Sequence, residues 1–277
     1  MNKGYVSEIR AWFSGYCRSY YSSDQEFQKN IALKEKHTFQ VYNNTLDICR
    51  GENLDEKRLQ LAGVIALLHD IGRFEQYRQH KTFRDSISVD HAKLGAKILE
   101  ECELLAPFHP DERSLIVHAV ELHNVFSIPA KVTEEELLFL KIIRDADKLD
   151  IWRVFIEYFS QPEEMRASAA GLGLPDSPDC SPEILAHLGL MDTVPLSSVK
   201  NLNDFKLMQL SWVYDLNFEA SFRLLIERDY IYSLASTLPE VEGVAEAVQI
   251  VRNFVDRKLL RSCGSYMARE CTVPPGR

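Results

Sequence analysis

The chain has 277 residues, and its 32 Lys and Arg against 41 Asp and Glu give a formal net charge of −9. This acidic balance argues against nonspecific binding to duplex nucleic acid, because neutralising the phosphates needs a basic face. The longest apolar run, Ala62 to Leu68, is much shorter than the ~20 residues of a membrane-spanning helix, and no apolar run of the signal-peptide kind begins the chain. The six cysteines form no C-x-x-C pair. We therefore expect a cytoplasmic protein with reduced thiols and no membrane partner.

Apolar residues recur at helical spacing along most of the chain and strand signals are scarce, so the sequence predicts an all-α protein. The expected helices are, in chain order, Val6–Tyr21, Asp24–Arg50, Asp55–Asp70, Val89–Cys102, Asp111–Asn124, Thr133–Phe159, Asn203–Leu238 (with a break) and Pro239–Leu260. Thr133 and Glu136 have the spacing of a capping box at one helix start. Two stretches are expected to be irregular: Gly72–Ser88, which is rich in basic residues, and Ala169–Pro195, a predicted loop or lid rich in Pro, Gly and Ser.

Histidine and aspartate occur where a metal ion would explain them. His69 and Asp70 end a very apolar predicted helix, where a carboxylate is costly unless a positive charge compensates it. His37 lies near the edge of another apolar helix face, and Asp147 lies four residues from both Ile143 and Ile151, on a buried face. Any one of these residues alone is as easily structural as functional. Together they favour a metal site, with Asp145 and Asp150 as further candidates to accept hydrogen bonds from ligand rings.

In this order, these residues resemble the pattern of the HD superfamily of metal-dependent phosphohydrolases. That pattern is a His on one helix, a His-Asp pair on the next, and a later Asp often within A-D-x-L-D; here these are His37, His69 with Asp70, and Asp147 in ADKLD. The segments LLHDIGRFE, DHAKLGAKIL and AVELHN are also similar to the family, and the resemblance runs from about Leu33 to Trp152. It implies an HD-domain helical fold with its metal-binding core over 24–160. Helices over 203–260 would pack on that core, within a single domain of residues 1–277.

The resemblance also implies where a second ion would bind. In two-metal members of the family, a His placed like His91 and a His on the following helix hold that ion. The following helix offers two, and spacing favours His123, which continues the core stripe, over His118, which does not. The expected ligands are thus His37, His69, Asp70 and Asp147 for one ion, with Asp70 bridging to an ion on His91 and His123. Whether one or two ions bind is left open; the mixed donors suit Mn, Fe, Co, Ni or Zn better than Ca.

A metal-dependent phosphohydrolase is the function that the resemblance implies. Bound ions lower the pKa of a water toward ~7 and neutralise the phosphoester oxygens that repel it. Asp70 is the expected catalytic group, and Arg73 and Lys81 are expected to meet the phosphates of a small phosphorylated substrate, with Arg84 as a further candidate. The resemblance suggests a nucleotide, either monoester or diester. Two alternatives stay open, a di-iron oxygenase and a non-catalytic helical module that senses nucleotides. A homo-oligomer is also allowed.

Overall fold

The computed structural model describes residues 4–270, and it leaves out the side chains of Glu163 and of residues 261–270. Every regular element between residues 4 and 270 is a helix, which confirms the all-α prediction. Within the same range, no helix is long and apolar enough to cross a bilayer.

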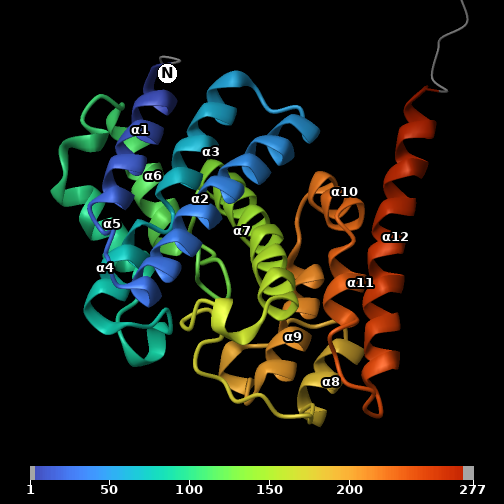
Figure 1. Cartoon of the computed structure of the whole chain (residues 1–277). Helices are drawn as coiled ribbons and strands as arrows, with labels where there is room; N and C mark the ends of the chain where they lie inside the picture. The colour runs from blue at the N-terminus through green and yellow to red at the C-terminus, as the bar shows by residue number, and fades with distance from the viewer. Residues whose placement is uncertain (1–3, 271–277) are drawn as a thin grey trace, which may run out of the picture. The chain divides into compact units, whose positions relative to one another are not determined.

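The chain divides into two compact units, Met1–Leu174 and Pro175–Arg277, which are described here one at a time (Figure 1). The division falls inside the stretch Ala169–Pro195, for which the sequence predicts a loop or lid. That the whole chain forms a single domain stays a prediction, and so does the lid.

Seven α-helices build the first unit. They are α1 (Gly4–Arg18), α2 (Gln25–Gly51), α3 (Glu56–Leu68), α4 (Ile71–His80), α5 (His91–Glu101), α6 (Pro110–Leu122) and α7 (Glu134–Ser160), with short 3₁₀ turns at Asp85–Ile87, Glu103–Leu105 and Glu163–Met165. The long helix α2 packs along both α3 and α7, while α4, α5 and α6 pack against one another in succession (Figure 1). Trp152 on α7 and Phe13 on α1 are fully buried in the core.

Side-chain caps begin these helices where the sequence indicates. Asp24 accepts hydrogen bonds from the first free amides of α2, and Asp90 does the same for α5. Thr133 and Glu136 form the predicted capping box at the start of α7. These caps fix where α5 and α7 begin, and therefore the register of the histidine and aspartates that the two helices carry.

Helix α4 occupies much of the stretch Gly72–Ser88 that was predicted to be irregular. Its basic residues obscured an amphipathic pattern, in which Phe74 and Tyr77 are buried and Arg78 is exposed. The helix ends at His80, and Lys81 follows in the left-handed conformation that commonly terminates helices. Only the second half of the stretch is irregular.

Two glycines bring α4 and α5 into backbone contact. A Cβ atom on Gly72 would lie 2.1 Å from the carbonyl oxygen of His91 and 2.8 Å from the amide nitrogen of Gly95. No side chain fits in that space, so the glycine lets the start of α5 lie directly against the start of α4. The contact places His91 beside the His69–Asp70 pair.

The second unit contains α8 (Pro182–Gly189), α9 (Leu202–Ser211), α10 (Glu219–Glu227), α11 (Tyr230–Ala235) and α12 (Val244–Glu270), with 3₁₀ turns at Leu196–Ser198 and Trp212–Asp215. Helix α12 packs against α8 and α10. The predicted helix Asn203–Leu238 is indeed broken, into α9, α10 and α11. Helix α8 lies in the stretch predicted as a loop, because Pro182 suits a first helical turn and Ile184 and Leu188 bury one face.

Candidate metal centre

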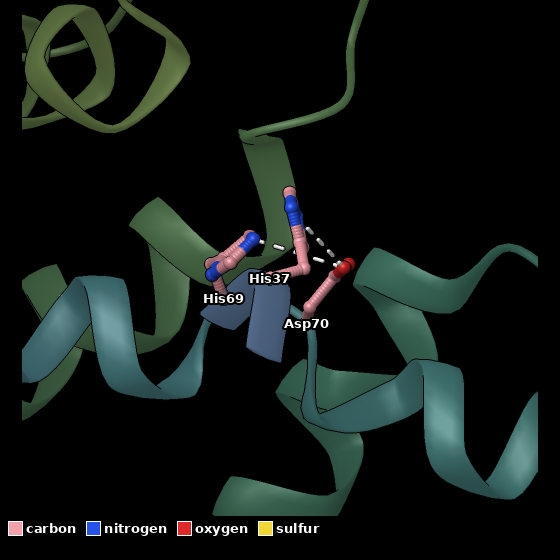
Figure 2. A group of neighbouring side chains, drawn as sticks. All are labelled: His37, His69 and Asp70. Atoms are coloured by element: carbon pink, nitrogen blue, oxygen red, sulfur yellow. Dashed lines mark ion pairs between the residues drawn. The ribbon is translucent and has the colours of Figure 1, made fainter. Parts of the chain in front are cut away.

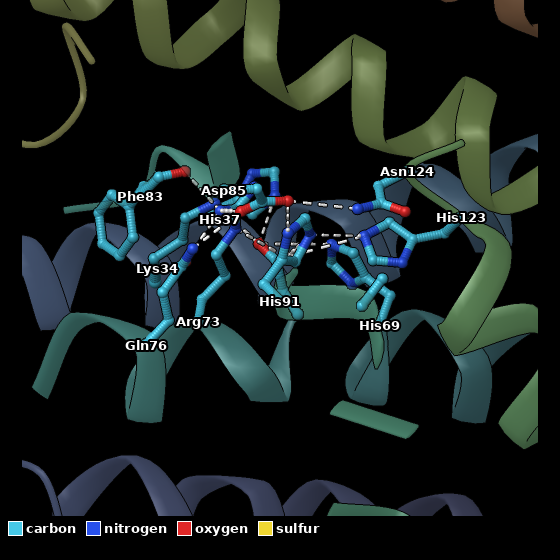
Figure 3. A network of polar contacts seen from close by, with 12 residues as sticks. Lys34, His37, His69, Arg73, Gln76, Phe83, Asp85, His91, His123 and Asn124 are labelled. Atoms are coloured by element: carbon cyan, nitrogen blue, oxygen red, sulfur yellow. Dashed lines mark hydrogen bonds and ion pairs between the residues drawn. The ribbon is translucent and has the colours of Figure 1, made fainter. Parts of the chain in front are cut away.

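Six side chains meet inside the first unit, and they are the six that the sequence predicts as metal ligands. His37 projects from α2 and Asp147 from α7; His69 and Asp70 form the link between α3 and α4; His91 begins α5 and His123 follows α6. The four rings lie close together, with His69 in edge contact with both His37 and His123 (Figure 3). Segments from His37 to Asp147 in the sequence therefore converge on one point.

The first group of ligand atoms consists of His37 Nε2, His69 Nε2 and Asp70 Oδ2, which lie within 4.8 Å of one another (Figure 2). Asp70 Oδ2 is 3.5 Å from His37 Nε2 and 3.7 Å from His69 Nε2. Asp147 Oδ1 joins this group, at 3.1 Å from His37 Nε2 and 3.9 Å from His69 Nε2. These four side chains are the predicted ligands of the first ion.

The second group uses the other oxygen of the same carboxylate. Asp70 Oδ1 is 3.3 Å from His91 Nε2 and 3.8 Å from His123 Nε2, and the two ring nitrogens are 3.1 Å apart. Asp70 thus directs one oxygen to each histidine pair, which is the arrangement expected of a carboxylate that bridges two ions.

Hydrogen bonds orient all four rings with Nε2 toward the centre. His37 Nδ1 lies 2.7 Å from Asp150 Oδ2, and His91 Nδ1 lies 2.7 Å from Asp85 Oδ2. The Nδ1 atoms of His69 and His123 lie 2.8 and 2.7 Å from the carbonyl oxygens of the residues three positions earlier, Ala66 and Val120. Carbonyl and carboxylate oxygens only accept, so each Nδ1 carries a proton, and in each neutral ring Nε2 has the lone pair that binds a metal.

The donor set fits a divalent transition-metal ion. His37 Nε2 and His69 Nε2 are buried without a hydrogen-bond partner, a costly state that a metal bond would relieve. Two imidazoles bound to one ion at ~2.1 Å each are about 3 Å apart, close to the 3.1 Å that separates the Nε2 atoms of His91 and His123. Nitrogen and carboxylate ligands in this combination suit Mn, Fe, Co, Ni or Zn.

Comparison with known families agrees with this geometry. Residues 35–152 match the family model of the HD domain. Over these residues the chain is similar to HD domains. HD domains bind divalent metals and belong to a family of metal-dependent hydrolases, and the matched residues include all six ligand candidates.

One solved structure is similar to this chain, that of a "predicted HD superfamily hydrolase" from an uncultured Thermotogales bacterium. The similarity covers 61% of this chain and 89% of that one, at 26% sequence identity and a TM-score of 0.39. No curated protein matches the chain.

The protonation states in the centre follow from its charges. Burial lowers the pKa of His123 to about 3, helped by the neighbouring rings of His91 and His69. For Asp70, burial favours the neutral acid, but the charge of Lys34 and contacts with histidines hold its pKa well below the usual range. Burial also favours the neutral acid of Asp147, but its contact with His37 lowers its pKa. Both carboxylates are therefore anionic at neutral pH, as metal ligands must be.

His37 differs from the other rings because two carboxylates face it. Burial and the charge of Lys34 would lower its pKa, but its contacts with the carboxylates of Asp147 and Asp150 raise it to about 9. A metal ion at this position would replace the proton on Nε2.

Of the cations predicted to meet the substrate, Arg73 lies at the centre and Lys81 does not. Arg73 Nε is 3.5 Å from Asp70 Oδ1. The ammonium of Lys81 instead lies 4.1 Å from the centroid of the Phe27 ring, because α4 extends to His80 and turns the next residue outward. Arg84 donates from Nε to the hydroxyl of Ser86, on the loop that follows.

His118 is also outside the centre. It is exposed on α6, where Nδ1 is 2.8 Å from Glu136 Oε1. The structure thus brings His123, rather than His118, to the second group of ligand atoms.

Two residues that the sequence did not indicate complete the surroundings. Asp85 accepts from Arg73 as well as His91, and so ties the loop after α4 to the centre. Lys34 Nζ lies 2.8 Å from Asp70 Oδ2. Lys34 precedes His37 by three residues, so the helical spacing placed it on the ligand-bearing face of α2; for Asp85, no pattern in the sequence marks the contact.

Proposed function

We propose that the protein is a metal-dependent phosphohydrolase that cleaves a small phosphoester by attack of a metal-activated water. The observation that carries the proposal is Asp70, whose two oxygens face two different histidine pairs. Two ions joined by one carboxylate can hold the attacking and leaving oxygens of a phosphoester displacement and supply the hydroxide.

The protein's own groups hold and orient the reacting parts. His37, His69 and Asp147 present their lone pairs on one side of Asp70, and His91 and His123 on the other. Hydrogen bonds from each Nδ1 fix the rings, so little reorganisation accompanies binding. The ligand histidines are almost completely buried, which keeps bulk water from competing for these positions.

The charge of the centre supports an anionic substrate. The carboxylates of Asp70, Asp85, Asp147 and Asp150 carry four negative charges, and the cations that contact them, Lys34, Arg73 and Arg153, carry three positive ones. One divalent ion makes this group net positive by one charge, and two make it positive by three. A buried site of positive charge favours a phosphate ester over an uncharged molecule.

A nucleotide is the substrate class that we propose, on the strength of the resemblance to HD phosphohydrolases. A di-iron oxygenase is the second candidate, because four histidines and two aspartates also suit two irons. The positive charge of the loaded centre favours the hydrolase, since an oxygenase substrate needs no charge of its own.

The test is metal analysis of the purified protein, followed by a screen for phosphate release. Nucleotide mono- and diesters would be incubated with Mn²⁺, Fe²⁺, Co²⁺, Ni²⁺ or Zn²⁺. We expect release from at least one ester, its loss in Asp70→Ala, and its retention in His118→Ala, whose histidine is outside the centre. Oxygen consumption by an iron-loaded protein that releases no phosphate would instead identify an oxygenase. Metal binding without any turnover would favour a nucleotide sensor.

A further inference from the structure

Lys34 occupies a position beside the first ion site from which it can contact a ligand bound there. Its ammonium is 2.8 Å from Asp70 Oδ2, the oxygen that faces His37 and His69. An ammonium has no lone pair, so it cannot bind a metal itself. It is a cation fixed next to a cation site.

A positive charge in this place needs an explanation. In a metal-free centre, Lys34 compensates the buried Asp70. Once a divalent ion takes over that role, the ammonium is a further positive charge a few ångströms from the ion, and the two repel each other. An anion that bound to both would remove the repulsion. A bound anionic group would therefore explain why a lysine lies next to the ion site.

Solvent reaches the centre at Lys34, Arg73 and Asp147. The side chains of the four ligand histidines and of Asp70 are at most 3% exposed, whereas those of Lys34, Arg73 and Asp147 are 16%, 15% and 21% exposed. Figure 3 shows Lys34 and Arg73 together at the end of the cluster near Phe83, away from His123. Both cations are therefore within reach of a small substrate that enters from solvent.

Lys34 and Arg73 both have hydrogen-bond donors to spare, since Arg73 Nε is buried without a hydrogen-bond partner. Arg73 Nη1 already donates to the carbonyl oxygen of Phe83, to Asp85 and to Gln76. Lys34 Nζ carries three hydrogens, and Asp70 is its one hydrogen-bond acceptor among the described residues. The ring of Phe83, 5.2 Å away, borders the ammonium without using a donor.

We propose that Lys34 is a catalytic residue of the centre, whose ammonium binds an anionic oxygen of the phosphoryl group. This proposal rests on the proposed phosphohydrolase function and adds the group that holds the phosphate on the solvent side. Arg73 Nη1 fixes Asp85, and through it His91.

The test compares phosphate binding in two substituted proteins. Lys34→Met keeps the length of the side chain and removes its charge, and Lys34→Arg keeps the charge. Lys36→Met is the matched control, because Lys36 is a neighbouring lysine on α2 that pairs with Glu157 at the surface. Each protein, loaded with Mn²⁺, would be assayed for metal content, for the dissociation constant of inorganic phosphate by calorimetry, and for kcat and KM on the best phosphoester.

The expected result is that Lys34→Met retains its Mn²⁺ but binds phosphate about 10- to 100-fold more weakly, the loss typical of a hydrogen bond to a charged group. Lys34→Arg should restore part of the affinity, and Lys36→Met should behave as the unaltered protein. Unchanged phosphate affinity in a fully loaded Lys34→Met protein would overturn the proposal. Loss of Mn²⁺ from that variant would also overturn it, by showing that Lys34 serves only to position Asp70.

The unaltered protein tests the underlying function separately. If it holds Mn²⁺ but neither binds phosphate nor releases it from any ester, the phosphohydrolase function fails and the role of Lys34 with it. If it hydrolyses an ester and only the comparison with Lys34→Met shows no difference, the function stands and the role of Lys34 alone fails.

Discussion

His69 and His123 owe their orientation to the ends of the helices that precede them. Each follows the last helical residue, of α3 and α6 respectively, and donates from Nδ1 to a carbonyl that the helix leaves free. His37 and His91 are held by carboxylates instead. Each histidine pair thus combines one ring fixed by backbone with one ring fixed by an aspartate, and only the aspartates can be removed by substitution.

Asp150→Ala tests the carboxylate behind His37. Without Asp150, Nδ1 loses its acceptor and the ring is free to turn or change tautomer, so we expect metal affinity to fall about 10- to 100-fold. The measurement is competition with a chelator of known affinity. Asp47→Ala, on α2 where the half-buried Asp47 pairs with Arg50, is the control. Equal affinities for the two variants would show that Asp150 does not orient the ligand.

His123→Ala should remove one ion and leave the other. Of the two Asp70 oxygens, its Nε2 lies near the one of the second group, and the first group keeps His37, His69 and Asp147. Elemental analysis should give two ions per unaltered chain and one per His123→Ala chain, with two retained in His118→Ala. If His118→Ala lost an ion as well, the assignment of His123 as the ligand would be wrong.

Residue types and helical spacing point to His37, His69, Asp70 and Asp147, and the resemblance to the HD superfamily adds His91 and a histidine on the next helix. The position of Lys81 could not be predicted in this way. Its approach to the centre depended on an irregular path after Gly72, and the extra turns of α4 place it over Phe27. Asp85 is the opposite case, since only the folded loop reveals its contacts with His91 and Arg73.

At the scale of elements, the close packing of α4 on α5 decides where His91 lies. Gly72→Ala would place a methyl group 2.1 Å from the carbonyl oxygen of His91, so the helices must separate. We expect a loss of about 1–3 kcal/mol in the free energy of unfolding, typical of overpacking, together with weaker binding of the second ion. Denaturant unfolding and metal analysis measure the two effects.

Gly15→Ala is the control for that substitution. Gly15 lies on α1, where an added Cβ would meet nothing within 4 Å. Alanine in such a position stabilises a helix by up to about 1 kcal/mol, so this variant should be neutral or more stable and fully loaded. A comparable loss in both variants would mean that the α4–α5 contact has no special role.

Helix boundaries could be predicted where a capping residue marks them. They could not be predicted where the amino-acid composition suggested a loop and hid the helical spacing of the apolar residues. Thr133 and Asp24 begin helices at the expected places. Helices α4 and α8 were missed because basic residues in one and Pro, Gly and Ser in the other suggested a loop, although each buries an apolar face. Both segments are helical because their apolar faces pack against neighbouring elements. The local sequence carries no information about those neighbours.

At the scale of the whole molecule, metal binding should stabilise the first unit. The six ligands come from well-separated segments of residues 37–147, so an unfolded chain cannot present them together. At a metal concentration of 100 times the dissociation constant, the expected gain is about 2.7 kcal/mol. Thermal unfolding should therefore shift upward with metal, and Asp70→Ala should abolish the shift. A shift of the same size in Asp70→Ala would place the stabilising ion elsewhere.

Hydrogen exchange would locate the stabilisation along the chain. We expect added metal to slow exchange in residues 35–152, which contain every ligand candidate. For the second unit the sequence predicts helices but no chemistry, because its side chains form no pattern of ligands or catalytic groups that we could identify.

Asp70 belongs to neither of the helices that it joins. Helix α3 ends at Leu68, α4 begins at Ile71, and the backbone of Asp70 between them is not helical. The angle between α3 and α4 is thus set at Asp70, the residue that would be shared by both ions. Without ions, Lys34 and Arg73 are the only permanent cations in contact with that joint among the described residues, so removal of the ions should loosen the connection between α3 and α4.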